Sequence, residues 1–273
     1  MRVKMMFTKK DIIVVRGGGD IATGTIHRLH NCGFSVLVLE VSKPSSIRRK
    51  VSFSEAIYDG EITIENVTAK YVKTLEEVNL CFANHTIPVM IDETAKILES
   101  IQPTVLIDAI LAKKNIGTTR NMAEITIGLG PGFTAGENVD AVIETMRGHN
   151  LGRIIYEGVA MKNTGIPGNI GGFTKERVIY SPVAGIIKNQ RVIGDIVEKD
   201  DVLAYVDDTP VLASISGVLR GIIRDGYTVT KGFKIADIDP RYTEKDNCFT
   251  ISDKARCIAG SVLEAMFYLK HNK

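Results

Sequence analysis

The chain has 273 residues, 44% of them hydrophobic and 24% charged, so it is long enough for one large domain and a smaller module. Its formal net charge is +2 and its basic residues are dispersed, which gives no reason to expect a nucleic-acid partner. No run approaches the roughly 20 apolar residues of a membrane span, and residues 1–10 lack the apolar stretch of a signal peptide. We therefore expect a cytoplasmic protein that binds neither nucleic acid nor a membrane.

The cysteines and the one tight basic cluster predict no binding site. The four cysteines show neither a CxxC motif nor Cys/His metal spacing, which indicates reduced thiols and no metal centre. Arg48, Arg49 and Lys50 form the only tight basic cluster, which we interpret as a solvated turn.

The first elements are a strand, a glycine turn, a helix and a second strand. Asp11–Val15 is a short apolar run rich in β-branched residues, as expected for a buried parallel strand. Apolar residues at helical spacing begin after Asp20 and end at Gly33, a residue type that often follows a helix. Ser35–Val41 then reads as the second strand.

The glycine turn predicts a nucleotide site. Gly17, Gly19 and Ala22 match the G-x-G-x-x-G/A fingerprint, in which backbone N–H groups approach phosphate at a helix N-terminus. Glu40 lies about twenty residues on, where an acidic side chain commonly binds a ribose 2′-hydroxyl. Asp20 either repels phosphate or caps the helix. The predicted cofactor-binding residues here are Gly17, Gly18, Gly19, Asp20, Ala22 and Glu40; the alternative is a packed turn without a ligand.

The middle of the chain extends the sheet. Ile87–Ile91 and Thr104–Ala109 read as strands on either side of a helical stretch at residues 93–100. Asp108 stands where the second of these strands should end, at the edge on which open α/β folds bind ligands. It is therefore a candidate catalytic residue, with a helix N-cap as the alternative.

A second glycine-rich loop, Gly130–Gly136, follows the predicted strand Ile125–Leu129. Its three glycines suit a backbone-lined loop close to a ligand, so Gly130, Gly132 and Phe133 are further cofactor-binding candidates; a structured turn is the alternative. The candidate proton donors are Lys113 and His149.

Residues near the C-terminus repeat with an offset of 32 positions. Each half reads as strand, glycine turn, short strand, turn and strand, and neither half alone could bury its apolar face. The pattern resembles the barrel-sandwich hybrid of biotinyl and lipoyl carrier domains, but its central hairpin, Asp207–Pro210, has no lysine to modify. We expect a docking or lid module, with a structural insertion as the alternative. The identities are Gly185/Gly217, Gly194/Gly226, Val197/Val229, Lys199/Lys231, Ala204/Ala236 and Asp207/Asp239.

These patterns predict an α/β protein in three parts. Residues 1–177 form a Rossmann-like nucleotide-binding domain with a mostly parallel sheet. Residues 178–241 form a small all-β, barrel-sandwich-hybrid-like module of two half-repeats. Residues 242–273 form a C-terminal helical segment that packs back on a domain.

Several long blocks of the sequence resemble the YqeB family. The resemblance covers nearly the whole chain and is carried by Val15–Gly24, Gly128–Gly136, Glu144–Arg153, Asn163–Gly168, Ser181–Gly185 and Ile235–Arg241. That family is regarded as accessory proteins of selenium-dependent molybdenum hydroxylases, which are relatives of xanthine dehydrogenase. The resemblance implies a maturation role with a molybdenum hydroxylase apoenzyme as partner, and it supplies no catalytic residue.

The fingerprint and the resemblance together give a leading hypothesis and two alternatives. The leading hypothesis is a maturation factor that binds a dinucleotide-type ligand, either NAD(P) or the dinucleotide form of molybdopterin. The alternatives are an NAD(P)-dependent oxidoreductase and a non-catalytic nucleotide-binding scaffold. The sequence leaves open whether the protein is catalytic and whether it forms a homo-oligomer.

Overall fold

The computed structural model describes residues 7–8 and 11–273, which fall into two compact units. The first unit takes in the chain up to Pro44, Ser52–Asn163 and Ile251–Lys273. The second unit takes in Ser45–Val51 and Thr164–Thr250. Each unit therefore includes a segment from a distant part of the chain: Ile251–Lys273 belongs to the first unit and Ser45–Val51 to the second. A division at residues 177 and 241 would separate these two segments from their units.

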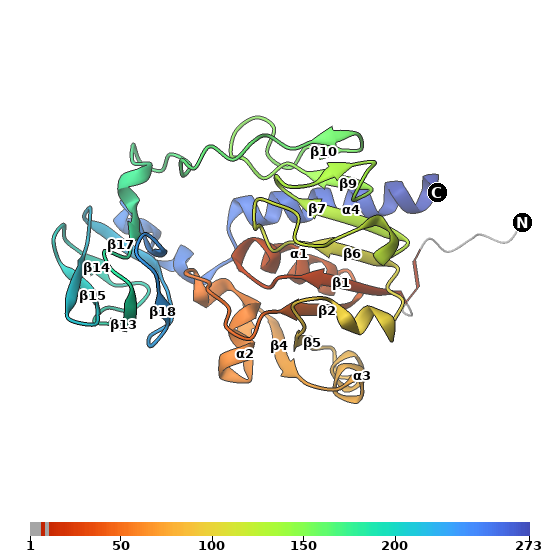
Figure 1. Cartoon of the computed structure of the whole chain (residues 1–273), viewed down its shortest axis with the longest axis horizontal. Coiled ribbons are helices and arrows are strands. Elements are labelled where there is room, and N and C mark those ends of the chain that lie inside the picture. The colour runs from red at the N-terminus through yellow and green to blue at the C-terminus, as the bar shows by residue number, and fades with distance from the viewer. Residues whose placement is uncertain (1–6, 9–10) are drawn as a thin grey trace, which may run out of the picture. The chain divides into compact units, whose positions relative to one another are not determined.

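A nine-stranded sheet forms the centre of the first unit, in the order β10-β9-β7-β6-β1-β2-β5-β4-β3 (Figure 1). Neighbouring strands from β4 to β9 are parallel, whereas the edge strands β3 and β10 are antiparallel to their neighbours. A separate pair joins β8 (Thr134–Ala135) to β11 (Gly158–Val159). The strands of the large sheet are β1 (Ile12–Arg16), β2 (Ser35–Glu40), β3 (Glu61–Ile64), β4 (Val67–Val72), β5 (Ile87–Ile91), β6 (Val105–Asp108), β7 (Ile125–Leu129), β9 (Ala141–Ile143) and β10 (Ile154–Ile155).

The central strands are apolar because both faces of the sheet are covered. Ile13, Val14 and Val15 of β1 have no exposed surface, and neither do Leu106 and Ile107 of β6. Continuous burial of this kind is typical of parallel strands between layers of other elements. The centre of the sheet is therefore the core of this unit.

The described residues of the first unit form the α-helices α1 (Asp20–Asn31), α2 (Ala56–Asp59), α3 (Leu75–Ala83) and α4 (Asp253–Asn272). Thr74 and Glu77 form a capping box at the start of α3, and Ser252 caps α4 by accepting a hydrogen bond from Ala255 N. Helices α1 and α4 lie side by side at Gly24, where an added Cβ would be 2.7 Å from backbone and side-chain atoms of Ala255. Among the described residues, no helix is both long and apolar enough to cross a membrane.

The second unit contains two four-stranded antiparallel sheets, β12-β19-β17-β14 and β16-β15-β13-β18. Its short helix η6 spans Tyr242–Phe249. The strands are β12 (Val178–Tyr180), β13 (Gly185–Asn189), β14 (Ile196–Val197), β15 (Val202–Val206), β16 (Thr209–Leu212), β17 (Gly217–Ile222), β18 (Thr228–Val229) and β19 (Lys234–Asp239).

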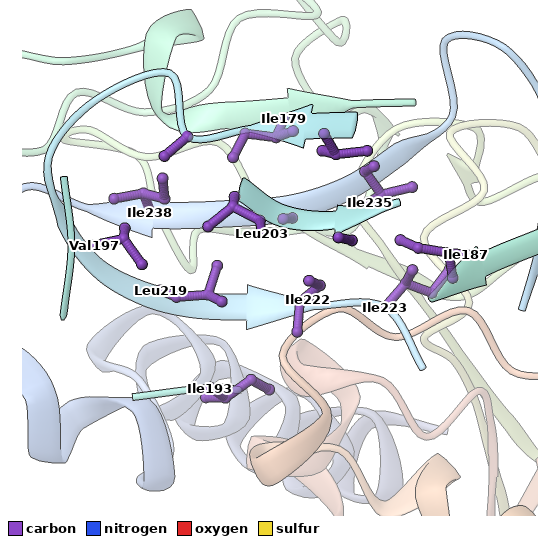
Figure 2. Close-up of a cluster of buried hydrophobic side chains, with 14 of the residues drawn as sticks. Ile179, Ile187, Ile193, Val197, Leu203, Leu219, Ile222, Ile223, Ile235 and Ile238 are labelled. Carbon is purple, nitrogen blue, oxygen red and sulfur yellow. The ribbon is translucent and has the colours of Figure 1, made fainter. Parts of the chain in front are cut away.

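The sequence repeat corresponds to equivalent strands in the two sheets. An offset of 32 residues relates β13 to β17, β14 to β18 and β15 to β19. The short middle strand of each half pairs with the first strand of the other half: β14 pairs with β17, and β18 pairs with β13. Both sheets contribute to one apolar core, which includes Ile187, Leu203, Leu219, Ile222 and Ile235 (Figure 2).

The predicted fold class, a Rossmann-like sheet followed by a barrel-sandwich-hybrid-like module, is wrong. The fully described connections from β6 to β7 and from β7 to β9 contain no α-helix, so the regular alternation of strand and helix stops after the first strands. Helix α4, which follows the second unit in sequence, packs beside α1 and contacts β7, β9 and β10. The protein is a mixed α/β protein with one large, mostly parallel sheet and separate antiparallel sheets.

The basic cluster at residues 48–50 is not a solvated turn, because Arg48 is buried in the second unit. Arg48 Nη2 donates to the carbonyl oxygens of Asn247 (3.0 Å) and Thr250 (3.3 Å). Arg49 Nε donates to Ile222 O at 2.8 Å. The two arginines thus attach the segment Ser45–Val51 to β17 and to the end of η6.

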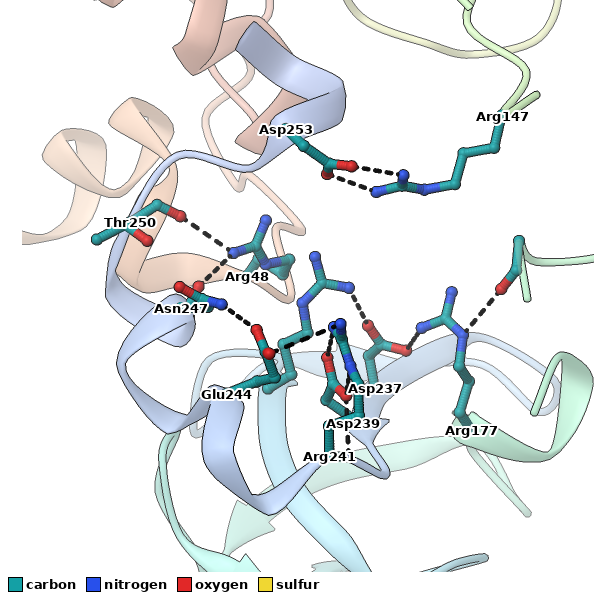
Figure 3. A network of polar contacts seen from close by, with 12 residues as sticks. Arg48, Arg147, Arg177, Asp237, Asp239, Arg241, Glu244, Asn247, Thr250 and Asp253 are labelled. Atoms are coloured by element: carbon teal, nitrogen blue, oxygen red, sulfur yellow. Dashed lines mark hydrogen bonds and ion pairs between the residues drawn. The ribbon is translucent and has the colours of Figure 1, made fainter. Parts of the chain in front are cut away.

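A buried ion cluster lies on β17 and β19 of the second unit (Figure 3). Asp237 contacts the guanidinium groups of Arg177 and Arg220, and all three side chains are buried or nearly so. Two residues along β19, Asp239 binds Arg241 through two hydrogen bonds of 2.9 and 2.8 Å. Residues two apart in a strand share a face, so Asp237 and Asp239 lie on the same side of β19.

Candidate functional site

The predicted site residues gather at the carboxyl edge of the large sheet. Strand β1 ends at Arg16 and continues into the glycine turn, β2 ends at Glu40, β6 ends at Asp108, and β7 leads into Gly130. These strands are parallel, so their carboxyl ends meet at one edge. Open α/β sheets bind ligands at this edge, beside the strand where the order reverses.

The first two glycines of the turn are required by the packing of the chain itself. Gly17 has a φ of +91°, and an added Cβ would lie 3.0 Å from Ile110 Cα. At Gly18 an added Cβ would lie 2.9 Å from Ser54 N, which donates a hydrogen bond to Gly18 O. Both glycines are buried, whereas Gly19 is partly exposed.

Gly19 is the N-cap of α1, and because it is a glycine the start of the helix has no side-chain capping bond. Asp20 is the first residue of the helix and not its cap, a position where a carboxylate is stabilised by the helix dipole. Ala22 is fully buried. The part of the turn that a ligand can approach is therefore Gly19 and Asp20, which are partly exposed.

Glu40 is joined directly to the glycine turn. Its Oε1 accepts a hydrogen bond from Gly18 N at 2.6 Å, and its Oε2 accepts one from Val41 N at 2.9 Å. Burial raises the pKa of this carboxyl group, while the two backbone hydrogen bonds act in the opposite direction. The side chain is held at the end of β2, beside the turn, where the sequence predicts a ribose contact.

Asp108 belongs to a buried polar network with a residue that the sequence analysis missed. Arg16, next to Asp108 in the strand register, donates to Thr118 Oγ1 at 2.6 Å and to Glu93 O at 3.0 Å. Thr118 Oγ1 donates to Asp108 Oδ2 at 2.6 Å, and Ile110 N donates to Asp108 Oδ1 at 3.2 Å. Arg16 and Asp108 are both almost fully buried. The visible signal is that Arg16 directly follows one predicted strand and Asp108 lies one residue before the end of another.

Lys113 and His149 lie in the loops after β6 and β9, and both are exposed. Lys113 has a φ of +63°, a left-handed conformation that is uncommon outside glycine. In the described part of the chain, no hydrogen bond or ion pair links Lys113, His149 and Asp108. The roles of the three candidate catalytic residues therefore stay predictions.

The second glycine loop, Gly130–Gly136, packs closely against neighbouring residues of the protein. An added Cβ at Gly130 would lie 2.6 Å from Thr145 Oγ1, and one at Gly132 would lie 2.6 Å from Lys114 Cα. Phe133 is buried in a small apolar cluster that includes Val139. These contacts explain the residue types at the three positions without a ligand.

A surface hollow of about 420 Å³ lies beside β10, and its lining includes none of the predicted site residues. Burial and the neighbouring Glu264 raise the pKa of Tyr156, on its wall, to about 12. The hollow is lined by Glu144, Asn150, Arg153, Ile154, Ile155, Tyr156, Glu157, Val159 and Met161.

The fold and the site define a mixed α/β protein with a glycine turn and an acidic residue at the carboxyl edge of its sheet. No family model matches the chain. Over 261 residues, 95% of its length, the chain is 49% identical to "Uncharacterized protein YqeB" of Escherichia coli (strain K12). The chain spans about half, 48%, of that protein's length.

The likeness to solved structures is weak. An aspartoacylase family protein from Mesorhizobium loti aligns with 79% of this chain and 60% of its own at 11% identity, with a TM-score of 0.24. The ectoine utilization protein EutE (DoeB) from Ruegeria pomeroyi aligns with 84% of this chain and 85% of its own at 10% identity, with a TM-score of 0.25. TM-scores of this size do not indicate a common fold.

Proposed function

We propose that the protein binds a dinucleotide-type ligand, either NAD(P) or the dinucleotide form of molybdopterin, at the N-terminus of α1. The observation that carries this proposal is the contact between Glu40 and the glycine turn. The Glu40 carboxylate at the end of β2 lies beside the glycine turn that leads into the N–H groups at the start of α1. The carboxylate is suited to ribose hydroxyl groups, and the N–H groups are suited to phosphate.

The proposed biological role is maturation of a selenium-dependent molybdenum hydroxylase, with the apoenzyme as partner. The resemblance of the sequence blocks to the YqeB family supports this role. Deletion of the gene should lower the selenium content and the activity of such hydroxylases in cells that make them. Unchanged values would contradict the maturation role.

Mass spectrometry of ligand extracted from the purified protein is the direct test of binding. We expect a pterin dinucleotide or a nicotinamide cofactor, and the mass identifies which of them is bound. Calorimetric titration then measures the affinities for NAD⁺ and NADP⁺. Absence of any extracted nucleotide, together with no heat of binding for either cofactor or for ADP, GDP and CDP, would contradict the proposal.

Gly19→Val should weaken nucleotide binding at least about tenfold while the protein stays folded, because the side chain would fill the space that phosphate must enter. Calorimetric titration measures the affinity, and circular dichroism checks the fold. Cys32→Val is the matched control, because Cys32 is the exposed C-cap at the other end of α1 and its φ of −81° is one that valine can adopt. Equal affinity in the folded Gly19 variant would contradict the placement of the phosphate.

Glu40→Ala should weaken binding by about 1 kcal/mol or more, the size of a hydrogen bond to a charged group. Glu61→Ala is the control, because the Glu61 side chain is 62% exposed on the edge strand β3. The wild-type protein should also bind the 2′-deoxy form of the nucleotide more weakly. Equal affinity for the two forms would remove the basis for a ribose contact at Glu40.

A further inference from the structure

Lys254 is a half-buried cation in the first turn of α4, within a cluster of charges. Desolvation by burial lowers its pKa, and the nearby Arg147 acts in the same direction. The carboxylates of Asp20, Glu144 and Asp253 oppose this shift. The cluster therefore joins the start of α1, the end of β9 and the start of α4.

Helices α1 and α4 run in the same direction, so both begin at the carboxyl edge of the sheet. At the start of α4, Asp253 accepts two hydrogen bonds of 2.7 and 2.8 Å from Arg147, which follows β9. Near its other end, Lys270 donates to both carboxylate oxygens of Glu124, immediately before β7. Helix α4 thus passes from the carboxyl edge to the amino edge, as α1 does after β1.

The close approach of the two helices places Lys254 beside the glycine turn. The backbones meet at Gly24 and Ala255, and Lys254 directly precedes Ala255. Asp20 lies one helical turn before Gly24 on the same face of α1. The side chain of a helical residue leans toward the helix N-terminus, which directs Lys254 toward this edge of the sheet.

We propose that Lys254 binds the phosphate groups of the nucleotide and that Asp20 holds its ammonium group in the ligand-free protein. This proposal rests on nucleotide binding at the glycine turn. The positive ends of two helix dipoles meet at this edge, and a phosphate there would gain a charge-assisted hydrogen bond from the lysine. Lys254 also offsets the charge of Asp20, which on its own would repel a phosphate.

The test uses the full chain and the nucleoside diphosphate among ADP, GDP and CDP that the wild type binds most tightly. Lys254→Met should weaken its binding about tenfold or more, and Lys254→Arg should keep most of the affinity. Lys270→Met removes the same charge from the far end of α4 and should leave the affinity unchanged. The affinity for the corresponding nucleoside, which has no phosphate, should be the same in all these proteins.

Asp20→Asn should have the opposite effect and strengthen diphosphate binding about two- to fivefold. In this variant, Lys254 no longer has to break an ion pair with Asp20 before it contacts the phosphate. If the wild type binds a diphosphate and the Lys254→Met and Lys270→Met variants bind it with equal affinity, Lys254 does not contact the phosphate. That result would leave the proposed nucleotide site uncontradicted. If Asp20→Asn binds no more tightly than the wild type, Asp20 does not hold the lysine. If the wild type binds none of the diphosphates and neither cofactor, the proposed nucleotide function fails first.

Discussion

Asp237→Ala is expected to lower the free energy of unfolding of the second unit by about 3–5 kcal/mol, the usual cost of leaving buried charges uncompensated. Asp237 is the carboxylate that Arg177 and Arg220 share, and it is 4% exposed. Denaturant unfolding of the full chain, followed by circular dichroism, measures the change.

The control for this prediction is Asp201→Ala in the same unit. Asp201 pairs with Arg191 at 3.4 Å, and the two side chains are 35% and 42% exposed. A partly exposed pair of this kind contributes no more than about 1 kcal/mol. If both variants lose the same stability, burial does not set the strength of the Asp237 cluster.

Gly24→Ala should destabilise the first unit by about 1–3 kcal/mol, although alanine favours a helix over glycine by about 1 kcal/mol. An added Cβ would lie 2.7 Å from Ala255 C, Cβ and O, so α1 and α4 would have to move apart. The thermal midpoint of unfolding measures the effect.

Gly260→Ala makes the same exchange in α4 and should raise stability by up to about 1 kcal/mol. At this position an added Cβ meets only the flexible end of Arg28, at 3.2 Å. The two substitutions should therefore shift the midpoint in opposite directions. A rise of the midpoint in both variants would show that helix propensity, and not the approach of the helices, dominates at Gly24.

Sequence reasoning succeeded where a pattern was local. The predicted strand Asp11–Val15 lies within one residue of β1 at each end, because a short β-branched run next to glycines has few alternative conformations. The predicted helical stretch at residues 93–100 is a short 3-10 helix, Lys96–Glu99. Its few residues do not define an amphipathic face long enough to distinguish the two helix types.

Sequence reasoning failed where residues far apart in the chain meet. Arg48 looks like part of a solvated turn until Asn247 and Thr250 are placed beside it. Lys254 has no motif that connects it with Asp20, since 233 intervening residues separate them. Likewise, periodicity within one half-repeat cannot show that β14 and β18 pair with the opposite half. Such contacts depend on topology, which one sequence specifies only weakly.

The order of segments along the chain affects how the protein can fold during translation. Residues 164–250, most of the second unit, emerge from the ribosome before Ile251–Lys273, which completes the first unit. Until α4 emerges, its contact surface on α1, β7 and β9 has no cover from that helix. The nascent first unit is therefore exposed to aggregation for longer than the second. A chaperone that shields apolar surfaces would act chiefly on that uncovered face.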